Sequence, residues 1–328
     1  MKVVHLVLSE TFAGIEQHVD ELLSNNLLNS PMLICNKSIA KNFNKNIKVF
    51  EFKNIGRRSL YGKYKLKKLI KSINPDIVHT HGSKTTSLIS SINNGSYKHI
   101  ATIHGIKTNK KVYKKADYVI GVSKKSIENI KNDNKVISNW WYPKLTKLKS
   151  KGHKYALAVG RLEKVKGYDL LISSWKKINM DLVIVGSGKE KQNLKNLINN
   201  NNLSSKIKIF DNVQRDELIK FYSDAKLLVV SSRNAGGPRV ALEALYLEIP
   251  VLSTDVGHMR SILPDELLAI PDDEKSLNEL LEKYVDNIEI LNQEAIFEYI
   301  ANEFSIDEKI QQIKDCLLYT SPSPRDDR

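Results

Sequence analysis

Short apolar runs alternate with longer amphipathic stretches along most of the chain. The apolar runs predict β-strands at residues 3–8, 32–35, 47–52, 76–81, 99–104, 117–123, 155–160, 181–186, 206–210, 227–232 and 250–254. Because these runs are continuously apolar, we expect strands that are buried on both faces of a parallel sheet. The stretches between them, such as residues 217–226, place apolar side chains at helical spacing. The alternation predicts an α/β fold built from βαβ units.

A basic stretch at residues 140–154 interrupts this pattern. It contains Pro143 and Gly152, and a new series of apolar runs begins directly after it. We therefore predict two Rossmann-like domains, over residues 1–150 and 151–302, with about six strands each. Ligands of open parallel sheets bind beyond the carboxyl ends of the strands, so a cleft between the two domains is the predicted site.

The end of the chain differs from the rest. Residues 318–328 contain two prolines and several serines and have no core pattern. This composition predicts a disordered or artefactual tail.

The composition is ordinary for a globular protein, with 41% hydrophobic and 27% charged residues. No apolar run approaches the roughly 20 residues that cross a bilayer, and the apolar start is too short for a signal peptide. Cys35 and Cys316 match no metal-binding or redox spacing, so we expect inert thiols in a reducing compartment. These features predict a cytoplasmic protein.

The net charge of +14 comes almost entirely from lysine and has three interpretations. It reflects a solvated surface, attraction of an anionic substrate, or docking to an anionic membrane face. The membrane interpretation fits one basic cluster with interleaved leucines and tyrosines. Its charged members are Arg57, Arg58, Lys63, Lys65, Lys67 and Lys68, and its apolar members are Leu60, Tyr61, Tyr64, Leu66 and Leu69. No nucleic-acid-binding module accompanies the charge, so we expect no nucleic-acid partner.

Two cations follow the strand that is predicted to end at Gly160. Arg161 and Lys166 lie on a short loop, and an amphipathic helix begins near Gly167. Cations beside a helix start are well placed to bind a diphosphate, although a solvated turn has the same pattern. Gly14, in the first βα turn, likewise allows a ligand to approach the backbone closely.

The segment SSRNAGGPRVALEA, residues 231–244, has a related arrangement. Its strand ends at Ser232, and Gly236 and Gly237 leave bare amides before a helix, which is a natural cradle for an anion. Glu243 lies in the first turns of that helix. Its carboxylate either binds sugar hydroxyls or complements the helix dipole.

Three histidines, His79, His81 and His104, lie at the ends of predicted strands. Side chains at such ends face the predicted cleft, but a lone histidine more often has a structural role. No third or fourth ligand makes a metal site plausible here, so we predict no metal site.

The order and spacing of these motifs resemble those of family 4 retaining glycosyltransferases with the GT-B fold. The matching segments are residues 12–19, 79–83, 102–105, 117–123, 159–167, 182–194, 209–232, 236–257 and 304–313. VGRLEKVKG and GGPRVALEA are the most specific of them. The resemblance runs from residue 1 to about 317. It implies two Rossmann-like domains that face each other across a cleft, and a C-terminal helix at 303–317 that crosses back to the first domain.

The resemblance also implies roles for single residues. Contacts to the diphosphate of an activated sugar are implied for Gly14, Arg161, Lys166, Gly236, Gly237, Arg239 and Val240, and contacts to the base for Gly186, Gly188 and Val213. Glu243 would bind the ribose hydroxyls, and His104 would lie beside the transferred sugar.

The implied reaction moves a sugar from a nucleotide-activated donor to a glycan or lipid-linked acceptor, with retained anomeric configuration. Arg161, Lys166 and helix amides would stabilise the leaving diphosphate. No Asp-x-Asp motif follows a strand, so we expect no metal and no cofactor. Such an enzyme would make cell-surface polysaccharide or glycoconjugate, in the cytoplasm or at the inner face of the membrane.

The sequence departs from the family's pattern at positions near the reacting sugar. Ala235 stands where the family has a glutamate, and Ala13, His258 and Ser261 replace a glycine, a glycine and a glutamate. We expect an active transferase in which Asn234 or a backbone group does part of the missing acid's work.

His104 and Asn234 are therefore the predicted catalytic residues. Two alternatives stay open: a catalytically weak or inactive binding subunit, and a sugar-nucleotide epimerase of the same fold.

Overall fold

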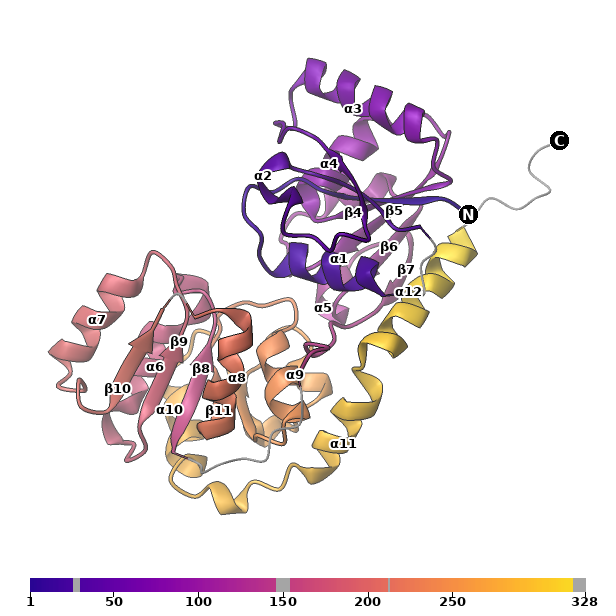
Figure 1. Ribbon diagram of the computed structural model, residues 1–328. Coiled ribbons are helices and arrows are strands. Elements are labelled where there is room, and N and C mark those ends of the chain that lie inside the picture. Colours follow the sequence, from indigo (N-terminus) through magenta and orange to yellow (C-terminus); the bar gives the residue numbers. More distant parts are fainter. Residues whose placement is uncertain (26–29, 146–153, 212, 321–328) are drawn as a thin grey trace. The chain divides into compact units, whose positions relative to one another are not determined.

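The computed structural model describes residues 1–25, 30–145, 154–211 and 213–320. The chain divides into two compact units (Figure 1). Unit 1 contains Met1–Asn139 and Ile306–Arg328, and unit 2 contains Trp140–Ser305. The units separate between Asn139 and Trp140, earlier than the predicted boundary at residue 150, which lies outside the described residues.

Unit 1 is built on a parallel sheet of seven strands in the order β3-β2-β1-β4-β5-β6-β7. The strands are β1 (Val3–Val7), β2 (Met32–Cys35), β3 (Lys48–Glu51), β4 (Ile77–His81), β5 (Lys98–Ile103), β6 (Tyr118–Gly121) and β7 (Asp133–Val136). The helices are α1 (Gly14–Ser24), α2 (Lys37–Ala40), α3 (Leu60–Ile73), α4 (Ser83–Ile92), α5 (Lys124–Ile127) and α12 (Ile306–Thr320). The central strands are almost fully buried, as their apolar runs predict.

Unit 2 is built on a parallel sheet of six strands in the order β10-β9-β8-β11-β12-β13. The strands are β8 (Tyr155–Val159), β9 (Leu182–Val185), β10 (Ile207–Phe210), β11 (Ala225–Val230), β12 (Val251–Thr254) and β13 (Leu268–Ala269). The helices are α6 (Tyr168–Ser174), α7 (Lys191–Asn200), α8 (Arg215–Asp224), α9 (Arg239–Tyr246), α10 (Glu274–Tyr284) and α11 (Glu294–Glu303). Both units are therefore Rossmann-like, as predicted.

The strand order of each sheet reverses at one place. β1 lies next to β4 in unit 1, and β8 lies next to β11 in unit 2. The loops that leave two such neighbours run to opposite faces of the sheet, so a crevice opens beyond the carboxyl ends of the strands. The topology of each unit thus predicts one ligand crevice, at β1/β4 in unit 1 and at β8/β11 in unit 2.

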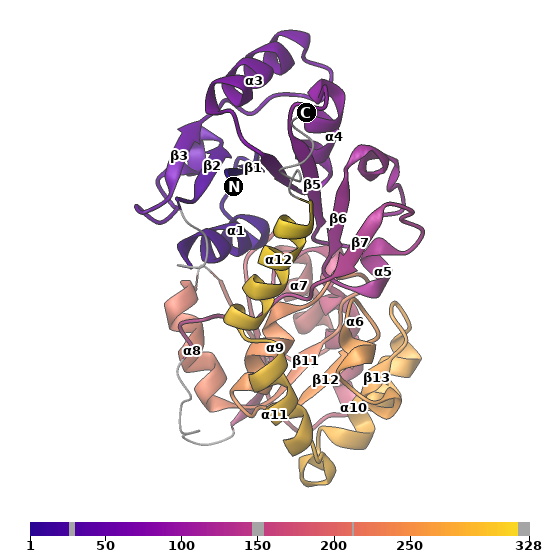
Figure 2. The same ribbon diagram turned by 90° about the vertical axis from the view of Figure 1, so that its right-hand side faces the viewer.

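Two edge strands, β7 and β13, are absent from the sequence-based prediction. β7 pairs with β6 and lies beside α5 (Figure 2), but the side chains of Asp133, Asn134 and Lys135 are exposed. β13 has only two residues. Neither strand is long and buried enough to produce an apolar run, which is the signal that identifies the others.

The C-terminal helix α12 packs within unit 1. Its Cys316 sulfur lies 3.7 Å from the Tyr118 hydroxyl, and Asn25 donates a hydrogen bond of 3.0 Å to Asp307. Residues 318–320 continue this helix, so the predicted tail begins too early, and its remainder, 321–328, lies outside the described residues.

Neighbouring leucines of α12 test this packing. Leu317 is fully buried, whereas Leu318 is 53% exposed. We expect Leu317→Ala to lower the unfolding free energy of unit 1 by about 2–5 kcal/mol, because it leaves a cavity. Leu318→Ala should change it by less than about 0.5 kcal/mol. Urea unfolding followed by hydrogen exchange of the β5 and β6 amides measures both, and equal effects would contradict the docking of α12.

Candidate functional site

In unit 2, the loop after β8 and the loop after β11 form one joined structure. We call residues 160–167 the β8 loop and residues 231–238 the β11 loop. The Ser231 hydroxyl donates to the Lys166 carbonyl (3.0 Å), and the Arg233 amide donates to the Val165 carbonyl (2.9 Å). The Arg233 guanidinium adds a bond to the Lys164 carbonyl (2.7 Å). These hydrogen bonds tie the two loops together.

Arg233 also anchors the β11 loop to two carboxylates. It binds both oxygens of Asp169 at 2.7 and 2.8 Å and one oxygen of Asp272 at 2.5 Å. Burial acts to raise the pKa of Asp169, but the hydrogen bonds and charge of Arg233 outweigh it and hold that pKa below its ordinary value. Bidentate pairs of this kind fix orientation as well as distance.

Glycines let the loop backbones touch. Gly167 has a φ of +66°, and a Cβ there would lie 2.1 Å from the Ser231 carbonyl oxygen. Gly257 has a φ of +60°, and its Cβ would lie 2.6 Å from the Gly236 carbonyl oxygen. Residues with a side chain would push the Gly236–Gly237 peptide out of its place.

Close backbone packing likewise explains why residues 186 and 188 are glycines. A Cβ on Gly186 would lie 1.8 Å from the Gly160 carbonyl oxygen, and one on Gly188 would lie 2.3 Å from that of Leu162. These glycines bring the chain after β9 against the β8 loop. Their contact with a base stays a prediction, as does that of Val213, which packs against the apolar core.

Two cations share the β8 loop. The Lys166 side chain lies over Gly160, with Cε 3.2 Å from the position of a Cβ there. Burial and the positive charge of Arg161 lower the pKa of Lys166, against the opposing effect of Glu163. Arg161 is paired with Glu163 at 2.7 Å. An anion bound here would relieve the repulsion between the two cations, which favours a phosphate ligand.

Glu243 is buried within α9, and its Oε2 accepts a hydrogen bond of 2.9 Å from the Tyr222 hydroxyl of α8. Tyr222 lies in the stretch 217–226, which the sequence predicts to be an amphipathic helix, but sequence reasoning does not give it this role. The signal was available, because a buried tyrosine hydroxyl needs a partner. Tyr222 fixes the orientation of the predicted ribose ligand.

The remaining predicted residues lie along the same loop and helix. Asn234 is exposed, and Gly236 and Gly237 are partly buried. Ala235 and Val240 pack against the apolar core of unit 2. The Arg239 Nε donates to the Trp140 carbonyl at 3.1 Å. The predicted phosphate contacts of Arg239 and Val240 stay predictions.

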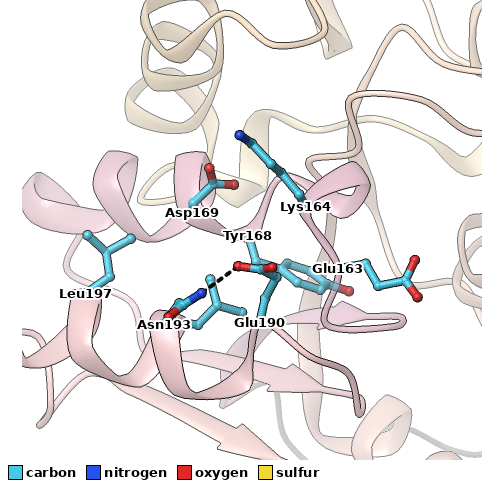
Figure 3. Close-up of a pocket in the computed structure, with 8 residues that line it drawn as sticks. Glu163, Lys164, Tyr168, Asp169, Glu190, Asn193 and Leu197 are labelled. Carbon is cyan, nitrogen blue, oxygen red and sulfur yellow. Dashed lines mark hydrogen bonds between the residues drawn. The ribbon is translucent and has the colours of Figure 1, made fainter.

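A pocket of about 310 Å³ lies between the start of α6 and α7 (Figure 3). Glu163, Asp169 and Glu190 line it, together with Lys164 and the apolar side chains of Tyr168, Leu194 and Leu197; Asn193 donates to Glu190 at 2.9 Å. Carboxylates repel a diphosphate, and none of the predicted donor-site residues lines this pocket. The negative charge of its lining therefore makes this pocket unsuited to the predicted diphosphate.

In unit 1, Gly14 opens α1 beside the β1/β4 crevice. Nothing lies within 4 Å of the position of a Cβ on Gly14, so packing does not require a glycine there. Glu16 closes the preceding turn by accepting from the Ser9 hydroxyl (2.5 Å) and the Ala13 amide (3.0 Å). The open space beside Gly14 is compatible with the predicted approach of a ligand.

Five histidines gather at the same crevice. They are His5, His18, His79, His81 and His104. The ring nitrogens of His5, His79 and His81 lie within 4.8 Å of one another, as do those of His18, His81 and His104. The statement that no third ligand exists is thus wrong for this part of the chain, because sequence reasoning overlooked His5 and His18. Burial lowers the pKa of His5 and of His104 to about 3, and that of His99 to about 4.

These pKa values predict that unit 1 loses stability in mild acid. An unfolded histidine takes up a proton near its ordinary pKa of 6.5, whereas folded His5 and His104 stay neutral down to about 3. Between those values the unfolded state binds more protons, so acidification favours unfolding. We expect about 1 kcal/mol per pH unit for each such histidine.

Urea unfolding at a series of pH values from about 7.5 to 5.5 measures this loss. His5→Phe should reduce the slope of stability against pH. A slope that is the same in both proteins would contradict the buried, neutral state of His5.

Comparisons with known proteins agree with this arrangement. Residues 145–300 match the model of a family described as glycosyl transferases group 1, and residues 30–139 match one described as glycosyl transferase 4-like. The chain is 28% identical over 307 residues to an uncharacterized glycosyltransferase of Methanocaldococcus jannaschii, a match that covers 86% of each chain.

Solved structures share the fold. A glycosyltransferase from Rickettsia africae superposes with a TM-score of 0.81 at 20% identity, over 97% of this chain and 98% of that one. Anabaena HepE in complex with UDP-glucose also gives 0.81, at 16% identity, over 97% and 100%. The fold is GT-B, as the resemblance implies.

Proposed function

We propose a function for this chain on the premise that it belongs to the glycosyl transferases group 1 family and is a glycosyltransferase. Its donor is a nucleoside diphosphate sugar, and its acceptor is a glycan or a lipid-linked saccharide of a cell-surface polymer. Transfer retains the anomeric configuration. One observation carries the proposal: two neighbouring cations, Arg161 and Lys166, lie on a loop that is bonded to a glycine-rich loop at the strand-order reversal of unit 2.

The proposed chemistry is departure of the diphosphate from the anomeric carbon. Negative charge grows on the diphosphate as this bond breaks. Lys166 and Arg161 neutralise that charge, with help from the amides of Gly236 and Gly237, so that neither a metal nor a cofactor is required. Because the loops are already bonded together, the protein does not have to reorganise as the charge develops.

The nucleotide would be held by its ribose and its phosphates. Glu243 accepts the ribose hydroxyls, and Tyr222 keeps its carboxylate turned the right way. Anabaena HepE was solved with UDP-glucose, and this supports a uridine nucleotide as the first donor to test.

A weak or inactive binding subunit is the second candidate. It is favoured by Ala235, which packs against the apolar core where the family has an acid. In that case the protein would bind a sugar nucleotide without transferring the sugar.

Substitution of the cations tests the phosphate site. We expect Lys166→Ala and Arg161→Ala each to weaken UDP binding about 10- to 100-fold, because each loses a charge-assisted contact. Lys164→Ala, an exposed neighbour on the same turn, is the matched control and should change the affinity little. Calorimetry gives the affinities and circular dichroism checks the fold. Unchanged UDP affinity in both variants would show that the phosphates bind elsewhere.

A donor screen separates the two candidate functions. The protein is offered a panel of sugar nucleotides with acceptor extracts, and mass spectrometry detects transferred sugar and released nucleoside diphosphate. We expect release with at least one donor, and faster release from Ala235→Glu, which restores the acid. If nucleotide binds but no diphosphate is released by either protein, the binding-subunit alternative holds.

Where the proposed acceptor is lipid-linked, α3 is the proposed contact of the protein with the membrane that carries it. Leu60, Tyr61 and Tyr64 are 81%, 69% and 65% exposed, and lysines surround them. Leu66 is buried, however, and belongs to the core rather than to this surface. Among the described residues, no helix has the length and apolar character to cross a membrane. The exposed face of α3 is suited to lie on an anionic bilayer.

We expect the protein to bind vesicles with anionic lipid and to leave them as salt rises. Lys65→Glu combined with Lys68→Glu should abolish binding, while Lys195→Glu combined with Lys208→Glu, which changes the net charge equally, should not. Sedimentation with vesicles measures this. Binding that is insensitive to salt, or equal in both double variants, would contradict docking through α3.

A further inference from the structure

Three histidines at the β1/β4 crevice form a continuous row. His5 Nδ1 lies 3.1 Å from His81 Nε2, and His81 Nδ1 lies 3.1 Å from His104 Nε2. The ring centres are 5.4 and 5.3 Å apart, and the rings are inclined by 17° and 32°. The rings thus meet end to end, nitrogen to nitrogen, as in direct N–H···N hydrogen bonds.

The neutral state of the row restricts its protons. Burial lowers the pKa of His5 and His104 to about 3 and that of His81 well below its ordinary value, so all three rings are neutral at pH 7. A neutral imidazole has one donor and one acceptor. His81 has both nitrogens bonded, so it must donate to one neighbour and accept from the other. All three rings then carry their proton on the same atom, either Nδ1 or Nε2.

The buried end of the row decides between these two states. His5 is 1% exposed, and its Nε2 has no hydrogen-bond partner among the described residues. If the row carried its protons on Nε2, His5 would bury an unpaired N–H donor, which is rare in proteins. With the protons on Nδ1, His5 Nε2 instead carries only a lone pair. The Nδ1–H state is therefore favoured along the row.

Two neighbouring histidines, His79 and His99, are hydrogen-bonded to threonine hydroxyls. His79 Nε2 bonds the Thr102 hydroxyl at 2.7 Å, and His99 Nε2 bonds the Thr80 hydroxyl at 2.9 Å. The ring of His18 meets that of His104 edge to face, with centres 4.7 Å apart. This contact limits rotation of the His104 ring.

We propose that His5 and His81 are positioning residues that fix His104 in its Nδ1–H tautomer, so that His104 offers its ligand a hydrogen-bond donor and not a base. The ligand atom that it recognises is an oxygen, either a sugar hydroxyl or a phosphate oxygen. The role of His104 beside a sugar rests on the proposed function. The tautomer of the row does not, because it follows from contacts within unit 1 alone.

Nitrogen NMR of the whole chain tests the row. The protein has eight histidines, so long-range ¹⁵N–¹H spectra of ¹⁵N-histidine-labelled protein can be assigned by single substitutions. At neutral pH we expect the Nδ1–H pattern for His5, His81 and His104. In His81→Phe, His104 should change to the Nε2–H tautomer that imidazole prefers in water. His99→Gln, outside the row, should leave His104 unchanged.

A second variant, His5→Phe, keeps the test decisive if His81→Phe does not fold. His5→Phe removes only the buried end of the row and should give a mixture of tautomers at His104. An Nε2–H or doubly protonated His104 in the unaltered protein would overturn the proposal. So would one equivalent of Zn²⁺ held tightly by these rings, because the nitrogens would then converge on an ion rather than bond to one another.

Kinetic measurements test whether the histidine row contributes to catalysis. With a donor found in the screen, His81→Phe should lower kcat about 10-fold or more, leave the donor KM within about 2-fold, and leave the pH profile flat between pH 6 and 8. An intact Nδ1–H row in a protein that transfers no sugar would refute the proposed function but not the row. A changed tautomer with unchanged kcat would refute the catalytic use of His104.

Discussion

A contact between two backbones holds the candidate donor site together. At Gly167 the β8 loop lies directly against the Ser231 carbonyl, with no room for a side chain between them. The bonds from Ser231 and Arg233 to the β8 loop are possible only at this separation. Apart from Gly14 in unit 1, every residue assigned to the phosphates stands on one of these two loops or on the helix that follows, so the geometry of those residues depends on this one approach.

The two units present different charges to a ligand. The crevice of unit 2 presents cations whose mutual repulsion an anion would relieve. The crevice of unit 1 presents imidazoles that burial keeps neutral. A leaving diphosphate needs charge, whereas a sugar needs hydrogen bonds without charge. This contrast suits the proposed binding of the nucleotide diphosphate to unit 2.

Sequence reasoning recovers much of the fold because strands buried on both faces carry their own signal. It fails for β7, where Asp133, Asn134 and Lys135 are exposed at a sheet edge. The β8 and β11 loops could be picked out from glycines and cations at strand ends, and their binding of phosphate stays a prediction. Gly186 and Gly188 show the limit of that reasoning, because close packing against the β8 loop accounts for both without any ligand.

The histidine row was not predictable in this way. His5 lies inside an apolar run, and it meets His79 and His81 only through the register of β1 with β4, in which His5 pairs with His79. For Tyr222, the helical pattern indicates burial and hence the need for a partner, but it does not identify Glu243, which lies on another helix. Such contacts depend on which strands become neighbours, and local patterns do not contain that information.

A crystal structure of the protein with UDP tests the central claim most directly. We expect the diphosphate within hydrogen-bonding distance of Lys166 Nζ and of the Gly236 and Gly237 amides, with the ribose hydroxyls on Glu243. A nucleotide bound instead in the carboxylate-lined pocket between α6 and α7, away from Lys166, would contradict it.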